Sequence, residues 1–287
     1  MKSNPGLEAI EQKGWIGAHK YLLLRRLSQI GILALFLLGP LYNIWIIKGN
    51  LSSSLFLETL PMTDPFMLLQ SIAAGHLPEL TAITGAITIL VFYFILGGRF
   101  FCSWVCPVNL ITDSAHWLRR KLKIRASTKL SRKTRFWVLA MSLVLPIILG
   151  TMAWELINPV SMFHRGVIFG MGLGWIVLIG IFLFDLLLTE HGWCGHICPL
   201  GAFYNLVGRY SPIKISAYQR ENCDKCMDCF AVCTEPQVLK MPLFGKDKGF
   251  SPMISSADCT NCARCIDVCS KQVFKITTRL PIKAEVK

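Results

Sequence analysis

Four long apolar runs without a charged residue constrain the fold of this chain more than any other feature. A helix of about 20 apolar residues spans the hydrocarbon core of a bilayer. One or two such runs are compatible with buried core helices, but four of them in a chain that is 53% hydrophobic and 16% charged predict four transmembrane helices. The runs are residues 27–47, 80–98, 136–154 and 166–184.

The basic residues are distributed unevenly among the segments between these runs. Five precede the first run and ten lie between the second and third, whereas the other two connecting segments contain only Lys48 and Arg165. Positively charged loops stay in the cytoplasm, so we expect a multi-pass membrane protein with both termini cytoplasmic. A basic stretch can also indicate nucleic-acid binding. Beside membrane spans, the net charge of +13 is better explained by topology and anionic headgroups, and no nucleic-acid partner is expected.

The twelve cysteines fall into four blocks of two kinds, and none is left over for a disulfide framework. Two blocks near the C-terminus have the spacing C-x2-C-x2-C-x3-C, which is the ligand pattern of two-cluster [4Fe–4S] ferredoxins. Two earlier blocks are C-x3-C pairs followed directly by proline. The pattern predicts an electron-transfer chain whose thiolates face the reducing cytoplasm. The tail blocks contain Cys223, Cys226, Cys229, Cys233, Cys259, Cys262, Cys265 and Cys269, and the paired blocks contain Cys102, Cys106, Cys194 and Cys198.

The two tail blocks predict two cubane clusters with crossed ligands. In ferredoxins of this type, the first three cysteines of a block bind one cluster and the fourth binds the other. Thr234 and Ser270 replace the proline that usually follows the fourth cysteine, but no ligand is lost. Zinc is the alternative for C-x2-C pairs, although two complete blocks without histidine partners favour iron–sulfur. We expect cluster I on Cys223, Cys226, Cys229 and Cys269, and cluster II on Cys259, Cys262, Cys265 and Cys233.

The two C-x3-C-P pairs are less specific, and three interpretations stay open. A spacing of four places both sulfurs on one face of a helix, which the proline then ends. The four thiols could form a third metal or cluster site where the two halves of the chain meet. They could also form a redox-active dithiol relay, or only pack at the membrane surface as free cysteines commonly do.

The chain contains an internal repeat in which each half has two apolar runs and a C-x3-C-P pair. The pairs are 92 positions apart, and both follow the cytoplasmic end of a run, as in parallel repeats. We expect a membrane α fold of four transmembrane helices in two parallel repeats, followed by a cytoplasmic two-cluster ferredoxin-like α+β domain. The expected segments are a basic cytoplasmic N-terminus (1–26), the first half (27–107), a basic cytoplasmic loop (108–135), the second half (136–199) and the ferredoxin-type domain (213–280). The outer loop 48–79 is either a docking surface for a partner or a re-entrant or interfacial loop.

Iron–sulfur clusters are the only cofactors that the sequence indicates. It contains no C-x2-C-H motif for a c-type haem, no histidine within the apolar runs for a b-type haem, and no glycine-rich nucleotide motif. A membrane ferredoxin is well placed to exchange electrons with the quinone pool, and quinol oxidation needs a base near the membrane. Glu155 and Asp185, at the ends of the third and fourth runs, are the candidate quinol-site acids, although a carboxylate at an interface is often only solvated. His164 and His191 are weaker candidates.

Several stretches of the chain resemble the membrane-bound quinol dehydrogenase ferredoxin subunits of the periplasmic nitrate reductase system, the NapH type. The resemblance covers nearly the whole length and is more specific than the ferredoxin blocks alone. It implies an inner-membrane protein that oxidises ubiquinol or menaquinol and passes electrons, with a periplasmic iron–sulfur protein, to a tetrahaem cytochrome or the nitrate reductase. The stretches that carry it are residues 52–55, 60–65, 101–107, 154–160, 190–199 and 226–229.

Two questions follow from this resemblance. Related membrane ferredoxins serve as assembly or maturation factors that reduce a metal or a thiol in a partner enzyme, which is the alternative function. The expected topology also places both clusters in the cytoplasm, about 30 Å of hydrocarbon away from a periplasmic acceptor. Either the C-x3-C-P cysteines and a bound quinone shorten this distance, or the cytoplasmic clusters do something other than carry the main current.

Overall fold

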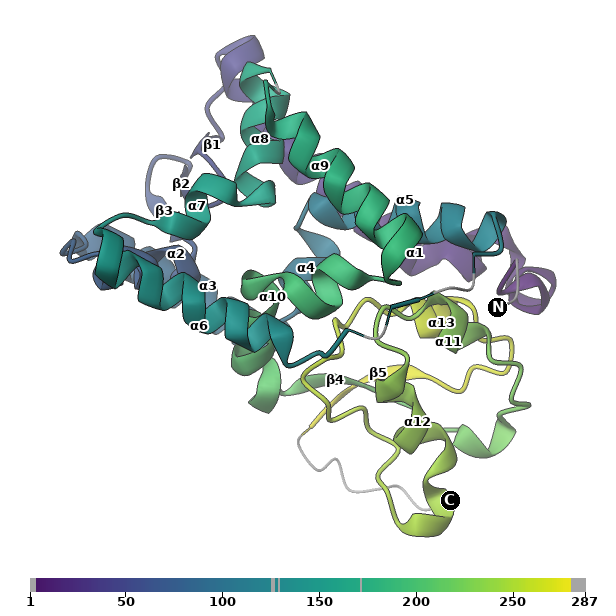
Figure 1. The fold of residues 1–287 in the computed structure, drawn as a ribbon. Coiled ribbons are helices and arrows are strands. Elements are labelled where there is room, and N and C mark those ends of the chain that lie inside the picture. The colour runs from purple at the N-terminus through teal and green to yellow at the C-terminus, as the bar shows by residue number, and fades with distance from the viewer. Residues whose placement is uncertain (1–3, 125–126, 129, 171, 280–287) are drawn as a thin grey trace. The chain divides into compact units, whose positions relative to one another are not determined.

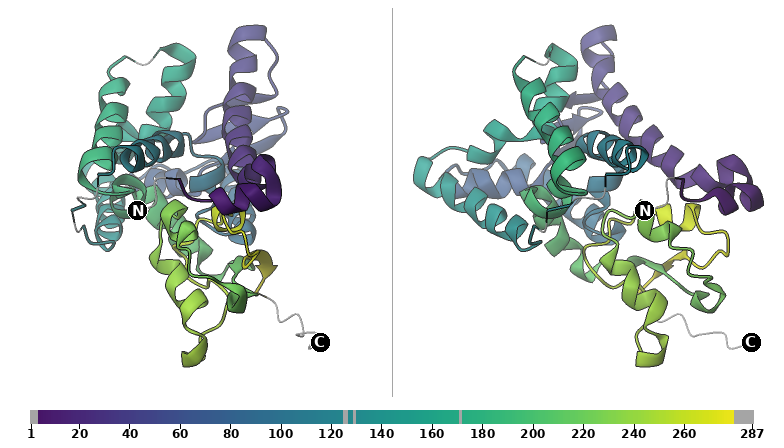
Figure 2. Two further views of the ribbon diagram at one scale, coloured as in Figure 1. Left: turned by 90° about the vertical axis from the view of Figure 1, so that its right-hand side faces the viewer. Right: turned by 45° about the vertical axis from the view of Figure 1, so that its right-hand side comes forward.

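The computed structural model describes residues 4–124, 127–128, 130–170 and 172–279. They form two compact units, each assembled from separated stretches of chain (Figures 1 and 2). We name them the cysteine-rich unit and the helical unit. The cysteine-rich unit combines Met1–Arg26, Tyr93–Trp104 and Tyr204–Lys287, and the helical unit combines Leu27–Phe92 and Val105–Phe203.

The longest element is helix α1 (Leu7–Tyr42), with 36 residues. It is kinked at Gly14, whose φ of 72° is accessible to a residue without a side chain. Within the described part of the chain, α1 is the one helix that is long and apolar enough to cross a membrane. Three further apolar helices have 17 residues or fewer, namely α3 (Leu80–Leu96), α6 (Thr134–Leu149) and the segment Gly174–Leu188.

The helical unit contains most of the apolar helices. Helix α5 packs against α9, α6 against the short helix α2, and α8 against α9. The remaining elements that lie mainly in this unit are β1 (Ile47–Gly49), β2 (Ser53–Phe56), β3 (Leu60–Thr63), α2 (Pro65–Ala73), α5 (Val108–Lys121), α7 (Ala153–Ile157), α8 (Pro159–Phe169), α9 (Gly174–Leu183), the π-helical turns η1 (Phe184–Leu188) and η2 (Trp193–Ile197), and α10 (Pro199–Val207).

The prediction of one uninterrupted helix over residues 166–184 is wrong. The chain there is divided between α8, which ends at Phe169, and α9, which begins at Gly174. Gly170 and Gly172 both have positive φ, 90° and 46°, and this conformation ends a helix. Helix α8 has its own start signal, because the Asn158 side chain accepts a hydrogen bond from a backbone N–H of the first turn.

The outer loop 48–79 is folded and forms part of the helical unit. Strands β1, β2 and β3 make an antiparallel meander. Asp64 caps helix α2 by accepting a hydrogen bond from the Phe66 N–H at 3.0 Å, and Pro65 occupies the first helical position. Phe66 is buried and its ring lies 5.5 Å from that of Phe203. The loop therefore contributes to the packed interior of its unit.

The segment 108–135, predicted as a basic loop, begins with helix α5. Arg119 on this helix is almost fully buried and donates to the carbonyl oxygens of Asp185 at 3.2 Å and Leu186 at 2.7 Å. Arg135 is also buried. Part of the positive charge that predicts topology therefore also holds the helices of this unit together.

The cysteine-rich unit is built of short helices around one small antiparallel sheet. Strand β4 (Ile213–Ser216) pairs with β5 (Lys275–Thr278), so that Ile213 lies opposite Thr278. Its core consists of buried apolar side chains from both tail blocks and the sheet. This agrees with the predicted α+β domain. The other elements are α4 (Phe100–Trp104), α11 (Asp228–Val232), α12 (Gln237–Phe244), α13 (Arg264–Asp267) and the 3-10 turns η3 (Gly208–Tyr210), η4 (Arg220–Asn222) and η5 (Lys246–Lys248).

Gly98 allows two backbone segments of the cysteine-rich unit to approach closely. A Cβ atom at this position would overlap the carbonyl oxygen of Tyr204 and lie 2.8 Å from the Cα of Gly208. The aromatic rings of Phe101 and Tyr204 stack beside this contact at 5.2 Å. Only glycine fits at position 98.

We expect Gly98→Ala to destabilise the protein by about 3 kcal/mol, because overpacking against rigid backbone cannot relax by a rotamer change. The unfolding temperature of detergent-solubilised protein measures this. Gly180→Ala is the matched control, since Gly180 lies in α9 with no heavy atom within 4 Å of the added Cβ. Equal unfolding temperatures for the two variants would contradict the close approach.

Candidate metal centre

Each tail block turns its backbone through two residues in the left-handed conformation. These residues are Lys225 and Met227 in the first block, with φ of 59° and 65°, and Asn261 and Ala263 in the second, with φ of 49° and 57°. They stand two and four positions after the first cysteine of their block. For a residue other than glycine, this backbone conformation is energetically unfavourable. Such residues occur often at ligand sites, where the surrounding structure holds them in place. Both blocks therefore wind in the same way.

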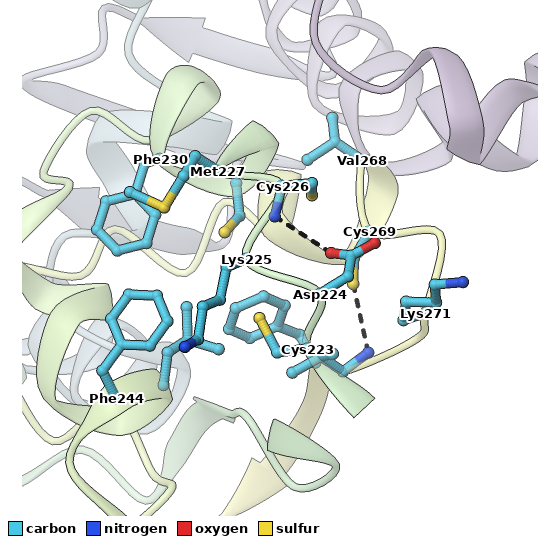
Figure 3. Close-up of a pocket in the computed structure, with 14 residues that line it drawn as sticks. Cys223, Asp224, Lys225, Cys226, Met227, Phe230, Phe244, Val268, Cys269 and Lys271 are labelled. Atoms are coloured by element: carbon cyan, nitrogen blue, oxygen red, sulfur yellow. Dashed lines mark hydrogen bonds between the residues drawn. The ribbon is translucent and has the colours of Figure 1, made fainter. Parts of the chain in front are cut away.

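Cysteines from both tail blocks line one pocket of the cysteine-rich unit, and Figure 3 shows Cys223, Cys226 and Cys269 together around it. The Asp224 side chain accepts a hydrogen bond from the Cys226 N–H at 3.2 Å, and the Val273 N–H donates to the Cys269 sulfur at 3.4 Å. A donor to sulfur favours the thiolate. The cysteines in the lining are Cys223, Cys226, Cys229 and Cys269, the set expected for cluster I.

The thiols affect one another in two groups. Burial raises the pKa of Cys229 to about 12, and Cys226, Cys269 and Cys223 add to the rise. The pKa of the Cys233 thiol lies well above its usual value because of burial and, next, because of Cys262 and Cys259. The fourth cysteine of each block therefore lies beside the first cysteines of the other block.

The donor set fits iron–sulfur clusters. Thiols with such raised pKa values are protonated at neutral pH, whereas thiolates bind metal, so cluster binding must release protons. Across residues 4–279, apart from the four undescribed positions in that range, no three His, Cys, Asp or Glu side chains are placed to hold one metal ion. The four thiolates of a cubane bind four different iron atoms and do not converge on one ion. Eight cysteine sulfurs in two groups satisfy that requirement.

The N-terminal part of α1 is bound to the second tail block. The Lys13 ammonium donates to the carbonyl oxygen of Cys269, and the Asp267 carboxylate accepts the backbone N–H groups of Tyr21 and Leu22, both at 3.0 Å. Asp267 is buried. Residues that sequence reasoning assigned only to a basic cytoplasmic segment therefore support the cluster loops.

A buried arginine anchors each C-x3-C-P block. The Arg25 Nε donates to the carbonyl oxygen of Ser103 at 2.9 Å, and the Arg135 Nη1 donates to that of Gly195 at 3.5 Å. Both arginines are 2% exposed and directly precede or lie close before an apolar run of the sequence, and both carbonyls belong to the residue after the first cysteine of a block. The internal repeat seen in the sequence therefore extends to these contacts.

The paired cysteines occupy different elements. Cys102 lies on α4, in the cysteine-rich unit, and Cys106 follows in the helical unit, where its carbonyl oxygen accepts a hydrogen bond from Gln29 at 3.3 Å. Cys194 lies in the π-helical turn η2, and its thiol is 3.9 Å from the Thr112 hydroxyl. π-Helical turns are rare and frequently occur at functional sites.

Glu155 lines a cavity of about 360 Å³ in the helical unit. Its carboxylate accepts hydrogen bonds from Ser161 at 2.5 Å, Asn158 at 2.9 Å and Ser52 at 3.4 Å, all of them buried side chains. A carboxylate held in this way beside apolar surface can receive a proton from an amphipathic ligand. The other lining residues are Thr151, Met152, Leu156, Ser161, Met162 and Arg165.

Asp185 has a different environment from Glu155. It is 1% exposed, accepts the backbone N–H of Trp193 at 2.8 Å, and is absent from the lining of the Glu155 cavity. Of the weaker candidates, His164 packs edge-on against Phe36 and His191 lies 4.2 Å from His116 between ring centroids. The structure therefore does not bring the two candidate acids to one cavity.

Sequence reasoning missed the polar residues that support Glu155 and the arginines that anchor the paired blocks. A signal existed for Asn158, because Asn followed by Pro is typical of a helix start. Ser52 and Ser161 carry no such local signal, since their contact joins residues more than a hundred positions apart. From the sequence, Arg25 and Arg135 are interpreted only as charges that orient the apolar runs in a membrane.

Two family models match the chain. One, described as a 4Fe-4S dicluster domain, matches residues 222–273. The other, described as a 4Fe-4S binding domain, matches residues 79–125 and 169–217, which include all four C-x3-C-P cysteines. No solved structure matches the chain.

Curated relatives cover almost the whole chain. The ferredoxin-type protein NapH of Escherichia coli is 50% identical over 97% of this chain and 96% of its own length. The NapH of Haemophilus influenzae is 50% identical over 98% and 97%. The methylamine utilization ferredoxin-type protein MauN of Methylorubrum extorquens is 49% identical over 95% and 94%. The chain belongs to the NapH family of ferredoxin-type proteins, and it is an iron–sulfur electron-transfer protein.

Proposed function

We propose that the protein is the iron–sulfur component of a quinol dehydrogenase in the bacterial inner membrane. In this function it takes electrons from ubiquinol or menaquinol and passes them, through a periplasmic iron–sulfur protein and a tetrahaem cytochrome, toward a periplasmic nitrate reductase. The observation that carries the proposal is the Glu155 cavity, which combines a supported carboxylate with apolar walls in a chain that also has cluster-binding thiols. The nitrate pathway rests on the family resemblance.

The surfaces of the apolar helices support a multi-pass membrane protein, and the distribution of the basic residues supports cytoplasmic termini. Large apolar side chains on these helices point outward, with Trp137 73% exposed, Ile148 72% and Ile176 67%. Apolar surface of this extent is stable in lipid and costly in water. In the proposed arrangement α1, α3, α6 and the α9–η1 segment cross the bilayer, and the shorter ones do so with local thinning of the membrane.

The proposal assigns all twelve cysteines. Cluster I is held by Cys223, Cys226, Cys229 and Cys269, and cluster II by Cys259, Cys262, Cys265 and Cys233. The thiol neighbours in the cysteine-rich unit support this crossing. The match to a 4Fe-4S binding domain favours a third cluster site over a dithiol relay or simple packing for Cys102, Cys106, Cys194 and Cys198.

Glu155 is proposed as the base that receives a quinol proton. The hydroxyl groups of Ser161 and Ser52 and the amide of Asn158 fix its orientation, and Arg165, which also lines the cavity, supplies positive charge. Met152, Leu156 and Met162 offer apolar surface for the quinol ring. Asp185 stays a second candidate acid, with its contact to Trp193 favouring a structural role. Iron–sulfur clusters supply one-electron acceptors for the two electrons of the quinol.

A second candidate function is the reduction of a metal or a thiol in a partner enzyme during its maturation. It is favoured by the 49% identity to MauN, a protein named for methylamine utilization. Relatives from two differently named systems share nearly equal identity with this chain, and a general reducing role would suit both. In this case the protein would not turn over with quinol.

Paired cysteine substitutions test the crossed ligand sets. With crossing, Cys223→Ala with Cys269→Ala removes two ligands of cluster I and leaves cluster II intact, because its four thiols are unchanged. Cys223→Ala with Cys233→Ala then damages both clusters. Iron and sulfide analysis with EPR of the reduced protein measures the remaining cubanes. The opposite result, with one intact cluster only in the second variant, would show uncrossed ligation.

The third cluster site is tested by counting iron. The variant with Cys102→Ala and Cys106→Ala loses two of four ligands, so we expect about a third of the bound iron to be lost, as one of three cubanes. The EPR signals of the two tail clusters should persist and serve as the internal control. An unchanged iron content removes the third cluster from the proposal.

Quinol oxidation by the purified protein in liposomes tests the function itself. With a periplasmic electron acceptor present we expect steady turnover, and without it only a brief burst. Glu155→Gln should slow turnover by about 100-fold, since general base catalysis typically contributes that much or more. Glu58→Gln changes an exposed carboxylate of the outer loop 48–79 and is the control. Absence of turnover in the wild type favours the maturation role, and normal turnover of Glu155→Gln excludes Glu155 as the base.

A further inference from the structure

The first C-x3-C-P block is hydrogen bonded to the loop that begins the ligand set of cluster II. Within the cysteine-rich unit, the Ser103 hydroxyl donates to the carbonyl oxygen of Thr260 at 2.8 Å, and the Trp104 indole N–H donates to that of Asn261 at 3.1 Å. Ser103 and Trp104 stand between the two cysteines of their block. Thr260 and Asn261 stand between the first two cysteines of the second tail block.

The same segment binds this loop on the other side of Cys259. The Arg99 guanidinium donates to the carbonyl oxygen of Asp258 at 2.9 Å and pairs with Glu235 at 2.7 Å. Arg99 and Glu235 are both 1% exposed. Three carbonyls in a stretch of four residues are therefore held by side chains of the segment 99–104.

The backbone is shaped for this contact. Gly97 has a φ of 103°, and a Cβ atom there would overlap the side-chain amide of Asn261. That amide in turn donates to the carbonyl oxygen of Leu96 at 2.9 Å. Glycine at position 97 is therefore required for the loop to approach this closely.

One buried cation is close to a thiol of each motif. Burial alone would lower the pKa of Arg99, but attraction to Glu235 and then to Cys102 raises it above its usual value. Burial raises the pKa of Cys259 to about 11, and Arg99 is among the groups that oppose this rise. The Arg99 guanidinium therefore interacts electrostatically with both Cys102 and Cys259.

The second C-x3-C-P block has different residues between its cysteines. At the positions equivalent to Ser103 and Trp104 it has Gly195 and His196, and glycine has no side-chain donor. The two blocks share their arginine anchors but differ in the residues between the cysteines. The two residues that bind the cluster II loop are therefore not repeated in the sequence of the second block.

We propose that Ser103 and Trp104 are positioning residues that seat the cluster II loop on the first C-x3-C-P block, and that electrons from quinol enter the C-terminal clusters at this contact. The inference rests on the proposed function. One quinol loses two electrons and two protons as it becomes quinone. When bound by the eight tail cysteines, the two clusters would supply one-electron acceptors for these two electrons, and the protons pass to Glu155 and to water.

Two variants remove single donors and leave the thiols in place. Trp104→Phe deletes the indole N–H but keeps an aromatic ring beside Phe100. In the wild type the ring centroids of Trp104 and Phe100 are 5.1 Å apart. Ser103→Ala deletes the hydroxyl. Trp117→Phe and Ser114→Ala are the controls, since both residues lie on α5 and are exposed.

Stopped-flow reduction of the tail clusters is followed with quinol and, separately, with dithionite, a water-soluble reductant that does not depend on a quinol site. We expect quinol reduction to slow by about tenfold in each donor variant, because rates depend steeply on the position of the reacting groups. Dithionite reduction, iron content and the EPR midpoint potentials should match the wild type. The controls should show wild-type rates with both reductants.

Other outcomes overturn the inference in distinguishable ways. If quinol reduces the wild-type clusters and the donor variants are equally fast, the contact is not the entry point and the proposed function stands. If a donor variant loses iron, or slows equally with dithionite, the residues stabilise the cluster and do not position an entry point. If quinol fails to reduce the wild-type clusters while dithionite succeeds, the proposed function falls and the inference falls with it.

Discussion

The buried ion pair between Arg99 and Glu235 is the interaction on which the cysteine-rich unit depends. The unit combines three stretches that are far apart in the sequence. Glu235 stands two residues after Cys233, and the second hydrogen bond of Arg99 goes to Asp258, directly before Cys259. The pair therefore fixes both tail blocks to the segment that carries Cys102. Removing one partner of a buried pair typically costs about 3–5 kcal/mol, because the other charge is left uncompensated. An arrangement of this kind adds little stability compared with apolar packing, but it fixes the register of residues 93–104 against the C-terminal stretch.

The ligand groups could be predicted from the sequence, whereas their supports could not. Spacing of C-x2-C-x2-C-x3-C encodes a backbone path, so the neighbours of Cys229 and Cys233 follow from the pattern alone, and the structure groups the thiols in the same way. Arg25, Arg99, Arg119 and Arg135 carry no comparable pattern. A basic residue next to an apolar run signals orientation in a membrane, and nothing local shows that its guanidinium turns inward to bind carbonyl groups. Their role depends on contacts across 60 to 136 residues of chain.

The apolar helices were largely predictable, and the errors have local causes. Hydrophobic length predicts α3 closely, whereas α6 ends at Leu149, before its apolar run does, and α1 begins at Leu7, well before its run, and ends at Tyr42. The prediction of one helix for the fourth run is wrong at Gly170 and Gly172. Mean hydropathy over a run is insensitive to single glycines, although these two end the helix. The outer loop 48–79 contains a helix start at Asp64 and Pro65, which its prediction as a loop does not include. Short strands such as β1 and β2 depend on pairing with each other and are weakly specified by their own residues.

The internal repeat separates what the two halves share from what distinguishes them. In both C-x3-C-P blocks, a buried arginine donates a hydrogen bond to the carbonyl oxygen of the residue after the first cysteine. The repeated framework therefore includes this hydrogen bond in each half. Between the cysteines, the first block has Ser103 and Trp104, which bind the cluster II loop, and the second has Gly195 and His196. The Glu155 cavity likewise belongs to the second half only. Relatives named NapH and MauN are equally similar to this chain, so the machinery common to them is more general than the substrate of either system. The two halves therefore share a framework of anchored cysteine pairs and differ in the residues that bind the second tail block and in those that line the Glu155 cavity.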